Sequence, residues 1–177
     1  MTLDALVEAA ALKRLARAGW VRVAVETPES VAAHSWGVSL LVLAFAPADI
    51  REKALMYAAI HDLAEVRVGD LTPADAVPRD VKHRRERDAM IELAPDLLDV
   101  WDAYEAQADD AARFVRECDR LDMAIQALAY HREGAAGMRE FVDSAGRVVR
   151  HPTLRPMIEA IQLEVVAGVS QDHGSGR

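Results

Sequence analysis

Apolar residues recur at spacings of three and four along most of the chain, the pattern of helices that bury one face. No sustained alternation of apolar and polar residues, the pattern of strands, interrupts them. With the capping and breaking residues, the pattern predicts helices over 3–17, 27–45, 49–65, 79–93, 95–108, 109–133 and 153–169, a short helix around 138–142 and a turn at 144–146. We therefore expect an all-α fold.

Length and composition indicate a single domain. The chain has 177 residues, of which 51% are hydrophobic, enough for one sizeable core. We expect this domain to cover residues 1–169 and to be followed by a flexible, polar tail over residues 170–177. His173 falls in that tail and is therefore not expected to bind a metal.

Cysteine content and hydropathy bear on the compartment. Cys118 is the single cysteine, so the chain contains no internal disulfide and suits a reducing compartment. The N-terminus lacks the pattern of a signal peptide, and every apolar stretch is too short to cross a membrane. These features predict a cytoplasmic protein without a membrane partner.

The formal net charge of −8 narrows the possible partners. Binding to nucleic acid polymers relies on Lys and Arg that displace counterions from phosphates, so an acidic surface argues against it. A small phosphorylated substrate stays compatible, because a bound cation and a few local arginines can reverse the field inside a pocket.

The predicted helix 27–45 places a histidine among apolar residues. His34 shares one face with Val31, Val38, Leu41 and Phe45, and this face must point into the core. Taken alone, such a histidine is more often a buried residue satisfied by a hydrogen bond than a metal ligand.

The next predicted helix adds more ionisable groups. His61 and Glu65 share the face of Ala54 and Ala58, and Asp62 directly follows His61. Burying these groups together is costly unless a cation compensates, and imidazole with carboxylate suits Zn, Mn, Fe, Co or Ni better than Ca. A solvated helix end is the alternative interpretation.

A fourth ligand would come from another helix. Asp119 and Asp122 lie three residues apart in the predicted helix 109–133 and so share one face. Periodicity cannot choose between them, and a polar stripe facing solvent would produce the same pattern.

Together, His34, the pair His61-Asp62 and a late aspartate resemble the H…HD…D signature of the HD-domain superfamily. Further segments are similar to its 5′-deoxynucleotidase branch, and within it to the HD-domain-containing protein 2 type. They are LKRLARAGWV (12–21), TPESVAAH (27–34), IHDLAE (60–65), GDLTP (69–73), KHRRE (82–86) and FVRECD (114–119).

The resemblance implies a single-domain helical bundle with a metal site between core helices. It favours Asp119 over Asp122 as the fourth ligand of one divalent ion, which could be Mn, Co, Zn, Fe or Ni. It also implies that Glu65 positions or deprotonates the attacking water and that Asp70 assists at the reacting phosphate. Without the resemblance, a helix-end charge and an Asx-turn would explain Glu65 and Asp70 better.

Substrate recognition is less well defined by the sequence. Some bacterial members of the branch carry an arginine immediately before the tryptophan, whereas Gly19 precedes Trp20 here. Trp20 could stack on a nucleoside or, equally, anchor the core. Lys82 and Arg85 could bind a phosphate, although such runs are more often solvated helix faces.

These observations predict a 5′-deoxynucleotidase that hydrolyses deoxynucleoside 5′-monophosphates. The resemblance also implies a homodimer. Two alternatives stay open: a phosphohydrolase of another small phosphorylated metabolite, and a non-catalytic module that binds a metal or a nucleotide.

Overall fold

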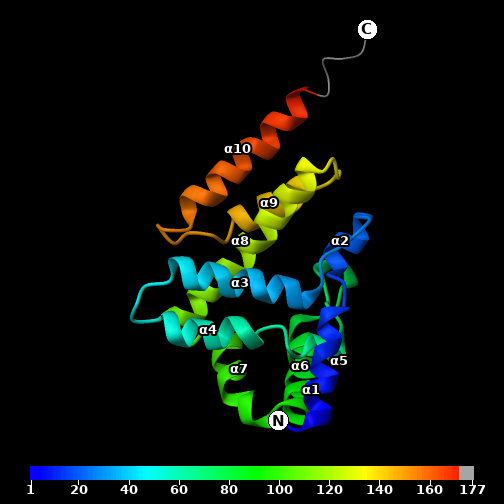
Figure 1. Ribbon diagram of the computed structural model, residues 1–177, viewed down its shortest axis with the longest axis vertical. Coiled ribbons are helices and arrows are strands. Elements are labelled where there is room, and N and C mark those ends of the chain that lie inside the picture. The colour runs from blue at the N-terminus through cyan, green and yellow to red at the C-terminus, as the bar shows by residue number, and fades with distance from the viewer. Residues whose placement is uncertain (172–177) are drawn as a thin grey trace. The chain divides into compact units, whose positions relative to one another are not determined.

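The computed structural model describes residues 1–171, with side chains described up to residue 167 (Figure 1). The predicted tail therefore lies outside the described residues, apart from its first two positions. Two compact units divide the chain, Met1–Val115 and Arg116–Arg177.

The described residues form helices joined by turns and loops, which confirms the predicted all-α class. An isolated bridge pairs Ala16 with Ser30, and no strand forms in the described part of the chain. The elements are α1 (Leu3–Ala9), η1 (Ala10–Lys13), α2 (Ala18–Arg22), α3 (Val31–Phe45), α4 (Arg51–Ile60), α5 (Glu65–Val68), η2 (Pro73–Asp75), α6 (Arg79–Leu93), η3 (Pro95–Leu97), α7 (Leu98–Glu105), α8 (Asp110–Arg132), α9 (Arg139–Gly146) and α10 (Arg155–Gln171).

The segment before α3 differs from the prediction. Ser30, and not Thr27, caps α3: its Oγ accepts a hydrogen bond from the N–H of Ala33 at 3.1 Å. The predicted helix 3–17 ends early as well, at Ala9, and a separate helix α2 follows. Backbone pairing explains both differences, because the N–H of Arg17 donates to the carbonyl of Glu29 and thereby keeps both segments extended.

Two further boundaries differ. The predicted helix 49–65 ends at Ile60, and residues 61–64 form turns before α5. The predicted turn at 144–146 is instead the last turn of α9, because Ala145 faces the core together with Phe141 and Val142.

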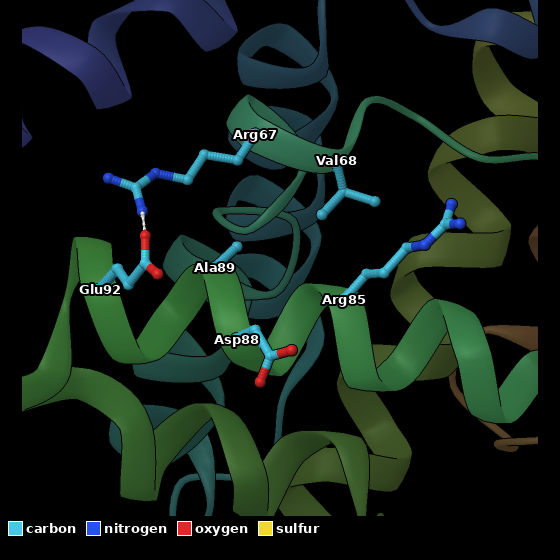
Figure 2. A pocket seen from close by; sticks show the side chains of 6 residues that line it. All are labelled: Arg67, Val68, Arg85, Asp88, Ala89 and Glu92. Atoms are coloured by element: carbon cyan, nitrogen blue, oxygen red, sulfur yellow. Dashed lines mark hydrogen bonds and ion pairs between the residues drawn. The ribbon is translucent and has the colours of Figure 1, made fainter.

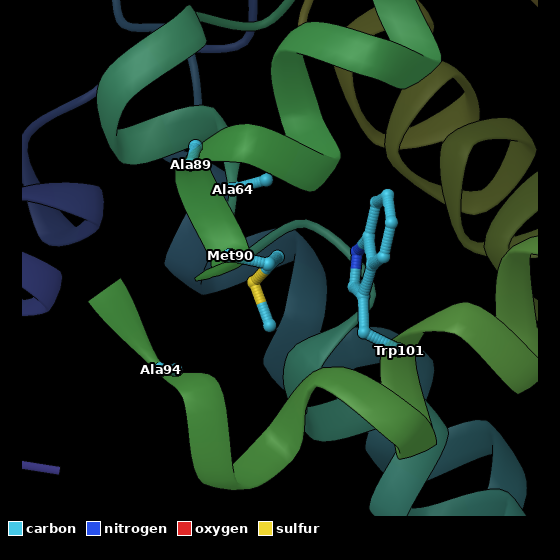
Figure 3. Close-up of a cluster of buried hydrophobic side chains, with 5 residues drawn as sticks. All are labelled: Ala64, Ala89, Met90, Ala94 and Trp101. Atoms are coloured by element: carbon cyan, nitrogen blue, oxygen red, sulfur yellow. The ribbon is translucent and has the colours of Figure 1, made fainter. Parts of the chain in front are cut away.

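The first unit is built from packed pairs of helices. α3 packs along α4, and α7 packs against both α4 and α6 (Figure 1). A buried cluster under α6 and α7 consists of Ala64, Ala89, Met90, Ala94 and Trp101 (Figure 3). The Trp101 indole Nε1 donates to the carbonyl oxygen of His61 at 3.3 Å, so this core cluster fixes the backbone at that histidine.

The second unit has its own core. α9 packs against α10, and the buried side chains between them include Phe141, Val142, Ile158 and Ile161.

Candidate metal centre

Three side-chain atoms of the first unit converge on one point. His34 Nε2, on α3, lies 3.5 Å from His61 Nε2, which follows α4. Asp62 Oδ2 lies 3.3 Å from His61 Nε2 and 3.7 Å from His34 Nε2. Both histidines are buried. The structure thus brings together His34, His61 and Asp62, which the sequence placed on two separate helices.

Hydrogen bonding orients the His61 ring. Nδ1 lies 2.9 Å from the carbonyl oxygen of Ala58, which can only accept, so Nδ1 carries the proton. In the neutral ring, Nε2 therefore presents its lone pair toward His34 and Asp62. Metal-binding histidines are commonly held by such a hydrogen bond from the other ring nitrogen.

Asp62 is held as a carboxylate. Burial by itself raises the pKa of Asp62, but the adjacent His61 and the guanidinium of Arg17 outweigh it and hold the pKa well below the usual range. Arg17 Nη1 donates to Asp62 Oδ2 at 3.2 Å, and both side chains are mostly buried. An ionised oxygen therefore faces the two imidazoles at neutral pH.

Glu65 is a buried acid without a full set of partners. It is 4% exposed, and its Oε2 has no hydrogen-bond partner among the described residues. Burial, followed by repulsion from Asp62 and Asp70, raises the pKa of Glu65 to about 10. A carboxyl group in this environment binds a proton strongly.

The loop after α5 places Asp70. Gly69 has a φ of 83°, a conformation that side chains with a Cβ rarely adopt, and its N–H closes α5 onto the carbonyl of Glu65. Asp70 Oδ2 then accepts the N–H of Ala18 at 2.7 Å, and Oδ1 lies 3.6 Å from Arg17 Nη1. Asp70 is thus tied to the segment before α2 rather than forming only a local turn.

Arg17 is a site residue that the sequence patterns did not single out. Its Nη1 contacts both Asp62 and Asp70, so one guanidinium bridges a candidate metal ligand and a candidate catalytic acid. The only available signal was its position three residues before Trp20, inside one of the segments that resemble the family.

Asp119 lies on the part of α8 that belongs to the second unit. Its carboxylate Oδ2 is 3.6 Å from Arg120 Nε, and its side chain is mostly buried. Asp122 follows three residues later on the same helix. The neighbouring Cys118 is buried, and burial raises the pKa of its thiol, in keeping with a packing residue. Asp119 as the fourth ligand stays a prediction.

The three predicted substrate-binding residues, Trp20, Lys82 and Arg85, lie in different surroundings. Trp20 is 2% exposed and its Nε1 donates to Glu29 Oε1 at 2.9 Å, so the ring anchors the core and offers no open face for stacking. The Lys82 ammonium donates to the carbonyl of Leu71 at 3.2 Å, next to Asp70.

Arg85 faces a different region. It is exposed and lines a surface cavity of about 390 Å³ with Arg67, Val68, Asp88, Ala89 and Glu92 (Figure 2). None of the three converging residues lines this cavity. The structure therefore does not bring Arg85 to His34, His61 and Asp62.

The donor set fits a divalent cation. Ligand atoms about 2.0 to 2.2 Å from one ion lie about 3 to 3.5 Å from each other. The separations of 3.5, 3.3 and 3.7 Å among the two imidazole nitrogens and the carboxylate oxygen are close to this range. Two nitrogens and one oxygen suit first-row transition metals and zinc better than calcium.

Within the described residues, no helix combines the length and the apolar character needed to cross a membrane.

An all-α fold that joins a histidine on one helix to a His-Asp pair after the next defines the HD class of proteins. The chain belongs to the HD domain family, whose pattern matches residues 9–158. This confirms the resemblance inferred from the motifs.

Similar proteins include named enzymes of this family. The 5′-deoxynucleotidase HDDC2 of Danio rerio is 37% identical over 164 residues, covering 86% of this chain and 82% of that protein. Human 5′-deoxynucleotidase HDDC2 is 32% identical, covering 92% and 87% of the two chains. A conserved hypothetical protein from Pyrococcus furiosus has a similar structure, with a TM-score of 0.80, 32% identity and coverage of 92% and 99%.

Proposed function

We propose that this protein is a metal-dependent phosphohydrolase that converts deoxynucleoside 5′-monophosphates to deoxynucleosides and phosphate. The observation that carries the proposal is the convergence of His34 Nε2, His61 Nε2 and Asp62 Oδ2 within 3.7 Å of one another. The similarity to proteins named 5′-deoxynucleotidase, over most of both chains, supports the reaction and the substrate class.

We assign the metal to these three residues, with Asp119 as the fourth ligand. The assignment of Asp119 rests on the VRECD segment that resembles the family. A bound Mn, Co, Zn, Fe or Ni ion would neutralise phosphoryl charge and lower the pKa of a water molecule. Imidazole and carboxylate donors suit each of these ions, so the donor set leaves the choice among them open.

Glu65 and Asp70 are assigned to proton transfer and to the orientation of the reacting groups. In the reaction, a water oxygen bonds to phosphorus, the bond from phosphorus to the 5′-oxygen breaks, and the leaving oxygen gains a proton. A cation held beside Asp62 would lower the raised pKa of Glu65, so that Glu65 Oε2, buried and without a hydrogen-bond partner among the described residues, can orient the attacking water and take its proton. Asp70, fixed by Ala18 and Arg17, would assist the departing 5′-oxygen through a bridging water molecule that supplies its proton.

A different small phosphate is the second candidate substrate. Gly19 stands where some relatives carry an arginine, and the buried ring of Trp20 offers no stacking surface for a base. These two features weaken the argument for a nucleoside while leaving the phosphoryl chemistry intact.

We also propose that the protein is a cytoplasmic homodimer whose first and second units form one HD domain. The single cysteine supports the compartment. Trp36, Leu40 and Leu43 recur at spacings of four and three on α3 and are exposed, which is an apolar surface of the kind that subunits bury. Light scattering on the wild type and on Trp36→Glu tests this: a dimer that the substitution dissociates is expected, and a wild-type monomer contradicts it.

The function is tested by a matrix of metals and substrates. The protein is stripped with a chelator, reloaded with Mn, Co, Zn, Fe or Ni, and assayed for phosphate release from deoxynucleoside and ribonucleoside monophosphates and from sugar phosphates. We expect metal-dependent release that is greatest with deoxynucleoside 5′-monophosphates. Release from sugar phosphates alone supports the second candidate, and no release from any monophosphate with metal bound rules out both.

A further inference from the structure

A buried acid on α6 has no part in the reaction outlined above. Glu86 is 8% exposed, although it is an ionisable residue on a helix with a mostly polar sequence. Its Oε1 lies 3.4 Å from the ammonium of Lys82, one helical turn earlier. Carboxylates are seldom buried unless they are paired, so this position calls for an explanation.

The ammonium of Lys82 is fixed at two points. It contacts Glu86 on its own helix and donates to the carbonyl of Leu71, the residue after Asp70. Lysine side chains are ordinarily mobile, and two anchors restrict this one to a single region of space. Glu86 and Leu71 therefore hold the charge beside the loop that carries Asp70.

The same ammonium acts on the candidate catalytic residues. α5, which begins at Glu65, packs against α6. The positive charge of Lys82 partly offsets the rise in the pKa of Glu65. Burial lowers the pKa of Lys82, but Glu86, followed by Glu65 and Asp62, outweighs burial and raises it. A cation in this place suits a substrate that brings two negative charges on its phosphoryl group.

We propose that Glu86 is a positioning residue, which holds the Lys82 ammonium against the Leu71 carbonyl so that Lys82 binds a phosphoryl oxygen of the substrate. The inference deepens the proposed phosphohydrolase function and rests on it. Glu86 acts only through Lys82 and does not touch the substrate.

The test is a double-mutant cycle with Glu86→Gln, Lys82→Met and the double variant, all loaded with the same metal. Calorimetry gives the Kd for inorganic phosphate, and steady-state kinetics gives KM and kcat for a deoxynucleoside monophosphate. We expect each single substitution to raise Kd and KM about tenfold, and the double variant to be no worse than Lys82→Met, because residues that act as one unit are not additive. Glu86→Asp should restore part of the affinity.

A matched control lies on the same helix. Asp80 pairs with Arg84 at the same spacing, but both side chains are exposed. Asp80→Asn should leave Kd and KM unchanged. Melting temperatures distinguish a structural role, since a lower Tm in Glu86→Gln with unchanged Kd and KM overturns the inference.

The two proposals can fail separately. If the protein binds phosphate through both Lys82 and Glu86 but shows no turnover, the hydrolase function is rejected and this inference is kept. The opposite result is also possible: the enzyme turns over, but neither Glu86→Gln nor Lys82→Met alters the Kd for phosphate, or the losses in the double variant are additive. Either outcome rejects the inference and keeps the hydrolase function.

Discussion

Arg17 donates a hydrogen bond from Nη1 to Asp62 Oδ2 at 3.2 Å, although 45 residues separate them in the sequence. The contact joins the segment before α2 to the turn after α4, and the same nitrogen lies 3.6 Å from Asp70 Oδ1. The guanidinium therefore helps to set the position and the charge state of the candidate metal ligand Asp62, although Arg17 is not itself a ligand.

Replacing Arg17 should weaken the metal site. Arg17→Met leaves the Asp62 carboxylate mostly buried without this partner, and losing a charged hydrogen bond of this kind costs about 1.5 to 3 kcal/mol. We expect metal affinity and kcat to fall by about 10- to 100-fold, a range that corresponds to that loss. Isothermal titration with Mn or Co and initial rates measure both quantities.

Arg14→Met is the matched control, because Arg14 is exposed in the same segment. Equal metal affinity in the wild type and in Arg17→Met would show that the bridge from Arg17 to Asp62 has no role in binding.

Removing the charge of Glu65 should separate metal binding from turnover. Glu65→Gln keeps the shape of the side chain but cannot take a proton from water, so kcat is expected to fall by a factor of about 10² or more. The bound metal, measured by elemental analysis, should stay at the wild-type level because Glu65 is not assigned as a ligand. Wild-type kcat in this variant would remove Glu65 from the mechanism.

Glu86 should make the stability of the fold depend on pH. Burial, opposed by Lys82 and reinforced by Glu105 and Asp62, raises the pKa of Glu86 from 4.5 to about 7. The folded state therefore keeps a proton that the unfolded chain releases, and the free energy of unfolding falls as the pH rises from 4.5 to 7. A shift of this size corresponds to at most about 3 kcal/mol.

Glu86→Gln lacks this titration. Urea unfolding at several pH values should show that the variant gains stability relative to the wild type between pH 4.5 and 7, with a constant difference above pH 7. Parallel curves for the two proteins would contradict the assignment.

Asp109 should stabilise the start of α8. Its Oδ1 accepts the N–H of Ala112 at 2.9 Å, and its Oδ2 accepts from the hydroxyl of Tyr57 at 2.9 Å and pairs with Lys53 at 2.6 Å. Asp109→Ala removes the helix cap and should lower the free energy of unfolding by about 1 to 2 kcal/mol. Asp109→Asn, which keeps a capping oxygen, should lose less.

The pH dependence at Asp109 has the opposite sign to that at Glu86. Burial raises the pKa of Asp109, but Lys53, the N–H of Ala112 and Tyr57 outweigh it and lower the pKa to about 2. The stabilisation is therefore present above pH 4 and lost as the pH falls toward 2. The difference in Tm between the wild type and Asp109→Ala should narrow as the pH falls from 4 through 2, and an undiminished difference at pH 2 would contradict the account.

Helical periodicity predicted the parts of the fold that depend on one buried face. It placed α3, α6 and α8 close to their observed bounds and turned His34 toward the core. It failed between residues 10 and 30, because the pairing of Ala16 with Ser30 involves backbone groups that leave no periodic signal.

The site was predictable where one helix face or one motif defines it. His61 and Asp62 were expected together because they are adjacent in the sequence, and their approach to His34 follows from the packing of α3 on α4. Arg17 was missed, because its contacts to Asp62 and Asp70 join distant segments. Trp20 could not be assigned from its residue type alone, since a tryptophan is equally suited to a pocket and to a core.

The most direct test of the metal-dependent hydrolase is the joint measurement of bound metal and phosphate release in the wild type and in Asp62→Asn, with the exposed Asp99→Asn as the control. We expect about one metal ion per wild-type chain and phosphate release from deoxynucleoside monophosphates, both lost in Asp62→Asn and both kept in Asp99→Asn. Full turnover in Asp62→Asn, or in wild-type protein stripped of metal, would contradict the proposed metal centre.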